Sequence, residues 1–152
     1  LMIDAQGNPR VIEFNCRFGD PETQPIMQRL QSALDRLCLA ALDGELQQHS
    51  VTWDERAALG VVLAAEGYPG SYDKGFVIEG LNQPQQSDVK VFHAGTQMQD
   101  GNVVTSGGRV LCVSALGDDI HSAQQRAYDA VKKLHWDGMT YRRDIGWRAL
   151  AR

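Results

Sequence analysis

The chain has 152 residues, of which 43% are hydrophobic and 22% charged, and its formal net charge is −4. This composition fits one ordinary globular domain or two small ones. The negative charge argues against a protein whose main function is to bind nucleic acid, because such binding needs clustered Lys and Arg to neutralise the phosphates. No apolar run is long enough to cross a membrane and no basic-then-apolar leader is present, so we expect no membrane span, no signal peptide and a cytoplasmic location.

The first residues predict a hairpin. Leu1-Met2-Ile3 is typical of the end of a strand, and the turn over residues 4–9 leads into a second, buried strand over residues 10–14. Nothing with the character of a cap or leader precedes Leu1. We therefore expect this chain to be a piece of a longer protein.

One helix is predicted next, ending near residue 42. Thr23 can cap it and Pro25 lies in its first turn. Apolar residues then recur at the spacing of a single helix face, at Met27, Leu30, Leu34, Leu37, Cys38, Ala41 and Leu42. Asp43-Gly44 ends the helix, and residues 45–56 are predicted to be a connector.

Residues 57–152 predict a second unit. Strands are expected over residues 59–65, near 76–78 and 89–92, and over 109–116, with a hairpin turn at Asp100-Gly101-Asn102. A helix capped by Asp118 or Asp119 and running to about Leu134 follows, with its inward face at Ile120, Ala123, Ala127, Ala130, Val131 and Leu134. Strands joined mainly by hairpins, with one long helix, indicate an α+β fold.

Several other residues favour structural interpretations. The cysteines are too few and too scattered for a disulfide framework or a zinc motif, and Cys38 and Cys112 lie in apolar stretches typical of a core. His93 is interpreted as a hydrogen-bonded turn residue, and the Arg142-Arg143-Asp144 run as a solvated ion pair. We expect three aromatic residues of the C-terminal tail to pack, namely Trp136, Tyr141 and Trp147.

The stretch VIEFNCRFGDPETQ over residues 11–24 contains the main candidate site. On a strand, Glu13, Asn15 and Arg17 form one polar row, with Ile12 and Phe14 packed behind it. A carboxylate and an amide oxygen at this spacing can reach one Mg²⁺ ion, and an arginine beyond them can hold a phosphoryl oxygen. An exposed strand face with a surface ion pair explains the same spacing equally well.

Two glycine-containing corners are the other candidate sites. Gly19 and Pro21 shape a tight turn from which Asp20 and Glu22 project, as they also would from a solvated turn. The Gly107-Gly108-Arg109 run can present backbone amides and a cation to an anionic substrate group, although a plain glycine turn before a strand is the commoner explanation.

The run EFNCRFGDPETQ resembles the signature of the phosphoribosylamine–glycine ligase family, also called glycinamide ribonucleotide synthetases, of the ATP-grasp superfamily. Further segments resemble the C-terminal part of that enzyme, namely LGVVLAAEGYPG, KVFHAGT, GGRVLCVSALG, AQQRAYDAV and YRRDIGWRA. The resemblance covers essentially the whole chain. One departure is Glu66, where a small residue such as glycine is expected.

The resemblance implies a reaction and residues that serve it. The family uses ATP to phosphorylate the carboxylate of glycine, and the amine of 5-phosphoribosylamine then attacks the acyl phosphate, in purine biosynthesis. Glu13 and Asn15 match the positions that bind Mg²⁺ or Mn²⁺, and Arg17 matches the arginine that stabilises the transferring phosphoryl group. Asp20 and Glu22 are expected on the substrate side of the site.

The resemblance also implies how the chain is organised. Residues 1–56 match the end of an ATP-grasp module, and residues 57–152 match a small, mainly antiparallel C-terminal domain with one long helix. The substrate domain and the ATP-binding lysines of the family lie upstream, so we expect the isolated chain to be inactive. Two alternatives remain open: a hydrolase with Asp20 and Glu22 as its acid–base pair, and a stand-alone binding or scaffold module without catalysis.

Overall fold

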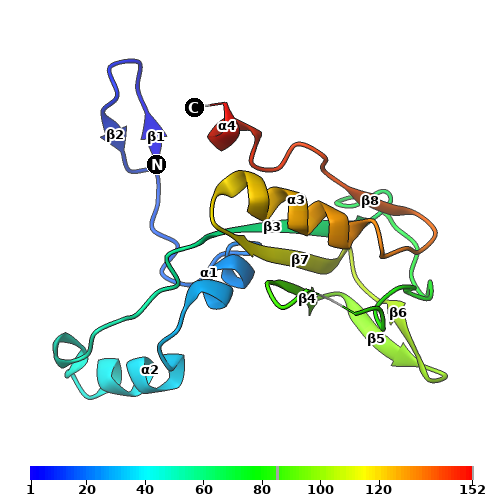
Figure 1. Cartoon of the computed structure of the whole chain (residues 1–152), viewed down its shortest axis with the longest axis horizontal. Coiled ribbons are helices and arrows are strands. Elements are labelled where there is room, and N and C mark those ends of the chain that lie inside the picture. The colour runs from blue at the N-terminus through cyan, green and yellow to red at the C-terminus, as the bar shows by residue number, and fades with distance from the viewer. Residues whose placement is uncertain (85, 152) are drawn as a thin grey trace.

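An antiparallel sheet forms the centre of the molecule in this computed structural model, which describes residues 1–84 and 86–151. Its strand order is β4-β7-β3-β8 (Figure 1). The long strands β3 (Ala57–Ala65) and β7 (Arg109–Gly117) lie in the middle, and β4 (Val89–His93) and β8 (Met139–Tyr141) form the edges. The α+β class and the antiparallel character predicted from the sequence are confirmed.

Helix α3 (Ile120–Val131) covers one face of this sheet (Figure 1). Asp119 caps it, because its carboxylate accepts a hydrogen bond of 2.7 Å from the Ser122 amide and the Ser122 hydroxyl completes a capping box. The predicted inward face is buried at Ala123, Ala127, Ala130, Val131 and Leu134. Small alanines let the helix approach the central strands closely, and Leu134 follows the end of the helix.

Helix α1 (Thr23–Arg29) lies on the opposite face, against β3 and β7. Gly60 of β3 makes room for it, since a Cβ there would lie 3.0 Å from Cγ of Pro25. Strand β7 is therefore covered on both faces, which explains why nearly all of its residues are buried. Cys112 of this strand is buried as predicted.

A separate hairpin joins β5 (Thr96–Gln99) to β6 (Asn102–Thr105). Asp100 and Gly101, with φ of 49° and 80°, form the predicted tight turn, in which both residues have a left-handed backbone. The strand expected near residues 76–78 is reduced to an isolated bridge between Val77 and Val104.

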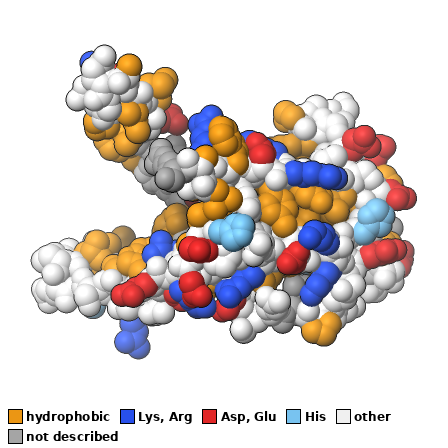
Figure 2. All heavy atoms as spheres, turned by 45° about the horizontal axis from the view of Figure 1, so that its top comes forward, with side chains coloured by type: hydrophobic (Ala, Val, Ile, Leu, Met, Phe, Trp, Pro, Cys, Tyr) orange, Lys and Arg blue, Asp and Glu red, His pale blue; other side chains and the backbone are white. Residues whose placement is uncertain are grey.

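The buried strand predicted over residues 10–14 is not formed. Strand β1 (Met2–Ile3) pairs only with β2 (Pro9–Arg10), and the chain beyond Arg10 has no strand partner among the described residues. Ile12 and Phe14, expected in the core, are 65% and 80% exposed. The β1–β2 hairpin stands away from the sheet (Figure 1), and hydrophobic side chains are exposed on this projection (Figure 2).

The single helix predicted up to residue 42 is two helices. Leu30 ends α1 with an extended ψ of 116° and forms a bridge with Trp53, and the Gln31 amide donates to the carbonyl of Thr52 over 3.0 Å. Backbone pairing with the connector therefore overrides the apolar periodicity. The N-cap of α1 is Glu22, so Thr23 is its first helical residue.

The second helix, α2 (Leu34–Leu42), continues into the 3₁₀ turn η1 (Leu46–Gln48) as an arm beside the body (Figure 1). Leu42 is 83% exposed on this arm. Cys38 is exposed as well, which corrects its assignment to the core. The arm carries its apolar side chains into solvent because no other described element covers its outer face.

The aromatic residues of the tail differ in their packing. Trp136 is buried and Tyr141 packs partly against the core, as predicted. Trp147, at the start of α4 (Trp147–Leu150), is 51% exposed, so the packing prediction is wrong there. Among residues 1–84 and 86–151, no helix combines the length and apolar character that a membrane crossing requires.

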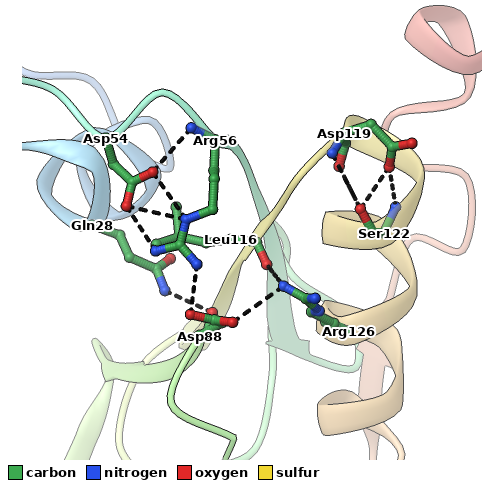
Figure 3. Close-up of polar contacts among 8 residues, drawn as sticks. All are labelled: Gln28, Asp54, Arg56, Asp88, Leu116, Asp119, Ser122 and Arg126. Atoms are coloured by element: carbon green, nitrogen blue, oxygen red, sulfur yellow. Dashed lines mark hydrogen bonds and ion pairs between the residues drawn. The ribbon is translucent and has the colours of Figure 1, made fainter.

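A polar network fastens the N-terminal third to the sheet (Figure 3). Arg56 donates to the carboxylates of Asp54 and Asp88 over 2.7 and 2.8 Å, and Asp88 also accepts from Arg126 of α3 over 3.2 Å. The hydrogen bonds to Arg56 lower the pKa of Asp54 to about 2. Gln28 of α1 joins the network by donating to the Asp88 carbonyl over 3.0 Å.

Candidate functional site

The RFGDPE loop (residues 17–22) is fixed by hydrogen bonds where it enters α1. The Thr23 amide donates to the Gly19 carbonyl over 3.0 Å, and the Thr23 hydroxyl donates to the same oxygen. The Glu22 side chain lies so close to Gly19 that a Cβ there would come within 2.2 Å of Oε2 of Glu22. A side chain at position 19 would therefore have to displace the Glu22 carboxylate, which lies over the backbone of this turn.

The predicted metal-binding and phosphate-binding residues lie in the extended segment before this loop. Glu13, Asn15 and Arg17 are exposed, and Cys16 between them has a left-handed φ of 47°. This kink interrupts the strict alternation on which the predicted polar row depends. The Arg17 guanidinium donates over 3.2 Å to the carbonyl of its neighbour Phe18.

The donor types at these positions suit a hard cation. Glu13 offers a carboxylate and Asn15 an amide oxygen, and magnesium sites commonly combine one or two carboxylates with substrate phosphates and water. Within the part of the chain that the structure describes, no group of three or more His, Cys, Asp or Glu residues is placed to hold a metal ion. A cation bound by Glu13 and Asn15 would take its remaining ligands from other oxygen donors, such as substrate phosphates and water.

Asp20 and Arg109, predicted separately from the sequence, are brought together. Nη2 of Arg109 lies 3.1 Å from Oδ2 of Asp20, and Nη1 donates to the Asp20 carbonyl over 3.2 Å. Burial and, to a smaller extent, the negative charge of Asp20 raise the pKa of the Cys112 thiol to about 11. The ion pair holds the Asp20 carboxylate beside the first residue of β7.

The Gly107-Gly108 corner before β7 is tightly packed. The Gly107 amide donates to the Gly95 carbonyl over 3.1 Å, and a Cβ on Gly95 would lie 2.6 Å from Cα of Gly107. A Cβ on Gly108 would lie 2.1 Å from the ring of Tyr68. The close approach of these segments thus requires glycine at position 95, and a side chain at position 108 would have to displace the Tyr68 ring.

A hollow of about 490 Å³ opens beside this corner. Its lining is apolar apart from a few polar groups, and it is formed by Val62, Ala64, Tyr68, Arg109, Thr140, Tyr141 and Arg142. Arg109 therefore faces both this hollow and the RFGDPE loop, which makes it the structural link between the two predicted corners.

Two further predictions on polar residues agree with the structure. Nδ1 of His93 lies 3.1 Å from the Thr96 hydroxyl, which fits a turn histidine. Arg142 and Asp144 form an exposed ion pair with an N–O distance of 2.8 Å. Among the described residues, neither His93 nor the Arg142–Asp144 pair forms a hydrogen bond or ion pair with the RFGDPE loop.

The network around Arg56 was not predicted from the sequence. Asp54 and Arg56 are two residues apart, and that spacing alone is compatible with a local ion pair. Asp88 and Arg126, however, lie 32 and 38 residues from their partners in the network. No local pattern relates residues at such separations, so only the tertiary structure shows this junction.

Comparison with known proteins identifies the family. The model of the family described as "Phosphoribosylglycinamide synthetase, C domain" matches residues 58–148. The chain therefore belongs to this family.

Individual relatives extend the match along the chain. A protein named phosphoribosylamine–glycine ligase from Vibrio parahaemolyticus is 61% identical over 152 residues, which are all of this chain and 35% of that protein. A protein of the same name from Escherichia coli O6:H1 is 62% identical over 153 aligned residues, covering 36% of its length. The chain thus spans about a third of the length of the curated relatives it matches.

A solved structure supports the fold. The crystal structure of phosphoribosylamine–glycine ligase from Thermotoga maritima aligns with a TM-score of 0.77 and 37% identity. The alignment covers 91% of this chain and 34% of that one. The mixed α/β architecture with its antiparallel sheet therefore corresponds to part of a ligase of known structure.

Proposed function

We propose that this chain forms the C-terminal part of an ATP-dependent ligase that joins glycine to 5-phosphoribosylamine in de novo purine biosynthesis, a cytoplasmic pathway. One observation carries the proposal: the run EFNCRFGDPETQ lies in a chain that matches ligases of that name over its whole length at about 60% identity. The products are glycinamide ribonucleotide, ADP and phosphate.

The proposed reaction has two steps, phosphorylation of glycine and transfer of the glycyl group to the amine. A carboxylate oxygen of glycine attacks the γ-phosphorus of ATP, which forms glycyl phosphate and releases ADP. The amine of 5-phosphoribosylamine then attacks the glycyl carbonyl carbon, and phosphate leaves with one oxygen from glycine. No covalent nucleophile from the protein is required, so positioning and electrostatic stabilisation supply the catalysis.

Glu13 and Asn15 would hold Mg²⁺ or Mn²⁺ through their carboxylate and amide oxygens. Such an ion would neutralise charge on the phosphate oxygens of the ATP substrate. Both side chains are exposed, so they are accessible to phosphates bound by another part of the ligase. Arg17 would act as the catalytic residue by donating to the transferring phosphoryl group, for which its planar fork is suited.

The two glycine-containing corners would lie on the substrate side of the site, with Arg109 bound to Asp20 rather than to the substrate. Asp20 and Glu22 supply negative charge that suits the ammonium group of glycine, and Gly107, Gly108 and Arg109 line the opposite corner. The ion pair between Asp20 and Arg109 supports this grouping, since it joins the corners directly. The remaining groups for ATP and phosphoribosylamine would come from N-terminal and ATP-grasp domains of the same protein.

Residues 1–56 would complete the ATP-grasp module, and residues 57–152 would form the C-terminal domain. Strand β3 begins at Ala57, immediately after the connector, which agrees with a change of unit at this point. The Arg56 network and the packing of α1 on the sheet would then hold the two units together.

An isotope experiment tests the proposed reaction in a full-length ligase that contains these residues. Glycine labelled with ¹⁸O in its carboxylate is converted in the presence of ATP, Mg²⁺ and fresh phosphoribosylamine, and the phosphate is analysed by mass spectrometry. We expect one ¹⁸O atom in each phosphate released, because the acyl phosphate passes a glycine oxygen to phosphorus. Phosphate without label would contradict a glycyl phosphate route.

A further inference from the structure

Arg109 stands on a rigid part of the fold. It is the first residue of the central strand β7 and pairs with Ala64 of β3. Its carbonyl accepts a hydrogen bond of 2.8 Å from the Gly95 amide, and the carbonyl of the preceding Gly108 accepts one of 2.8 Å from Ala65. The base of this side chain is therefore fixed by the sheet, and its guanidinium extends toward the RFGDPE loop.

The guanidinium of Arg109 holds Asp20 at two points. One outer nitrogen faces the carboxylate at 3.1 Å and the other donates to the backbone carbonyl at 3.2 Å. A contact to a carbonyl oxygen fixes the path of the main chain as well as the direction of a side chain. Since Thr23 holds Gly19 from the other end, the loop is fastened on both sides of Asp20.

The exposure of this pair indicates that it contributes geometry more than stability. The side chains of Arg109 and Asp20 are 38% and 56% exposed. Ion pairs in contact with water contribute little to the free energy of unfolding. Two convergent hydrogen-bonding contacts across a sequence separation of 89 residues nevertheless restrict where the loop can lie.

We infer that Arg109 is a positioning residue, which acts through Asp20 to orient the loop carrying Arg17 beside the segment of Glu13 and Asn15. This inference rests on the proposed function and refines it. Both outer nitrogens of Arg109 contact Asp20, so an anionic substrate group would compete with a carboxylate for them. Through this pair the C-terminal domain acts on the phosphate chemistry without touching the nucleotide.

A double-mutant cycle in a full-length ligase tests the inference. Groups that orient metal ligands typically change metal affinity or activity by 10–100-fold when removed. We expect Arg109→Gln to raise the Mg²⁺ concentration needed for half-maximal turnover by about tenfold and to lower kcat similarly. In an Asp20→Ala background, the same substitution should change either value by only about threefold, because the carboxylate contact is already lost and only the bond to the backbone carbonyl of residue 20 remains.

Two further variants separate geometry from charge. Arg109→Lys keeps the positive charge but contacts one point instead of two, so we expect it to recover only part of the loss. Arg142→Gln removes an exposed arginine that pairs with Asp144, and it should leave kcat and the Mg²⁺ requirement unchanged. Correct folding of each variant is checked by its thermal unfolding midpoint.

Hydrogen exchange gives a readout independent of turnover. In Arg109→Gln, peptides over residues 17–24 should exchange several-fold faster than in the unsubstituted ligase, whereas Arg142→Gln should not alter them. Unchanged exchange of this loop would overturn the inference. An equal loss of activity from Arg109→Gln in both backgrounds, together with a raised KM for substrate, would also overturn the inference, because it would indicate that Arg109 contacts the substrate directly. Absence of glycine-dependent ADP release by the unsubstituted ligase would instead refute the proposed function and leave the exchange comparison valid.

Discussion

Glu13→Gln in a full-length ligase containing this chain should lower Mg²⁺-dependent turnover by about a hundredfold or more. Glutamine preserves the size of the side chain and one oxygen, but it removes the negative charge that attracts a hard cation. Glu13 is exposed in the structure, so the substitution removes no core contact. The measurement is kcat as a function of Mg²⁺ concentration, with partial recovery expected at high Mg²⁺.

Glu79→Gln is the matched control for this experiment. Glu79 is also exposed, and its backbone pairs with His135 far along the chain from the RFGDPE loop. We expect this variant to retain normal kcat and a normal Mg²⁺ requirement. If Glu13→Gln kept full turnover at low Mg²⁺, the assignment of Glu13 as a metal ligand would be wrong.

The second large effect is expected for Arg17→Lys. Lysine keeps the charge but loses the planar fork that can donate two hydrogen bonds to a phosphoryl group. We expect kcat to fall by roughly a hundredfold, with a much smaller change in the KM for glycine, because the lost contact strengthens mainly in the transition state. Steady-state kinetics with glycine as the varied substrate measure both values.

Arg36→Lys provides the comparison for Arg17. Arg36 is exposed on α2, away from the RFGDPE loop in the chain, and the same change of charged group there should leave kcat unaltered. A raised KM with normal kcat for Arg17→Lys would place Arg17 in ground-state binding. Unchanged values for both constants would remove it from the reaction.

The second part of the fold could be predicted from the sequence because its signals are local. Asp100-Gly101 specifies a tight hairpin turn, and Asp119 with Ser122 specifies the start of α3. Strand β3 alternates between buried and half-buried residues along its length, the period that a strand on a packed sheet requires. Each of these signals involves residues a few positions apart, and the tertiary structure agrees with them.

The N-terminal third depends on partners that no local pattern identifies. Leu30 leaves the predicted helix because it pairs with Trp53, which lies in the connector. Residues 11–14 have the apolar character of a strand but no neighbouring strand among the described residues, so their side chains remain exposed. Apolar periodicity predicts what a segment can bury, whereas its actual structure depends on what lies beside it.

The candidate site was predicted in its residues but not in its connections. The run EFNCRFGDPETQ draws attention to Glu13, Asn15, Arg17, Asp20 and Glu22 by resemblance to a family signature. The pairing of Asp20 with Arg109 could not be predicted, because 89 residues separate them and no periodic pattern spans that distance. The sequence thus identified the candidate residues, and the structure showed which of them contact one another.

Incubation of the purified, isolated chain with ATP, Mg²⁺, glycine and fresh phosphoribosylamine tests the central claim most directly. Only Glu13, Asn15 and Arg17 of the proposed phosphate-handling groups lie in this chain, and phosphoryl transfer depends on a complete set of such groups. With folding verified by a cooperative thermal transition, we predict no glycine-dependent ADP release above background, whereas a full-length ligase containing the same residues should release ADP in a glycine-dependent manner. Glycine-dependent ADP release by the isolated chain itself would contradict its assignment as the C-terminal part of a larger active site.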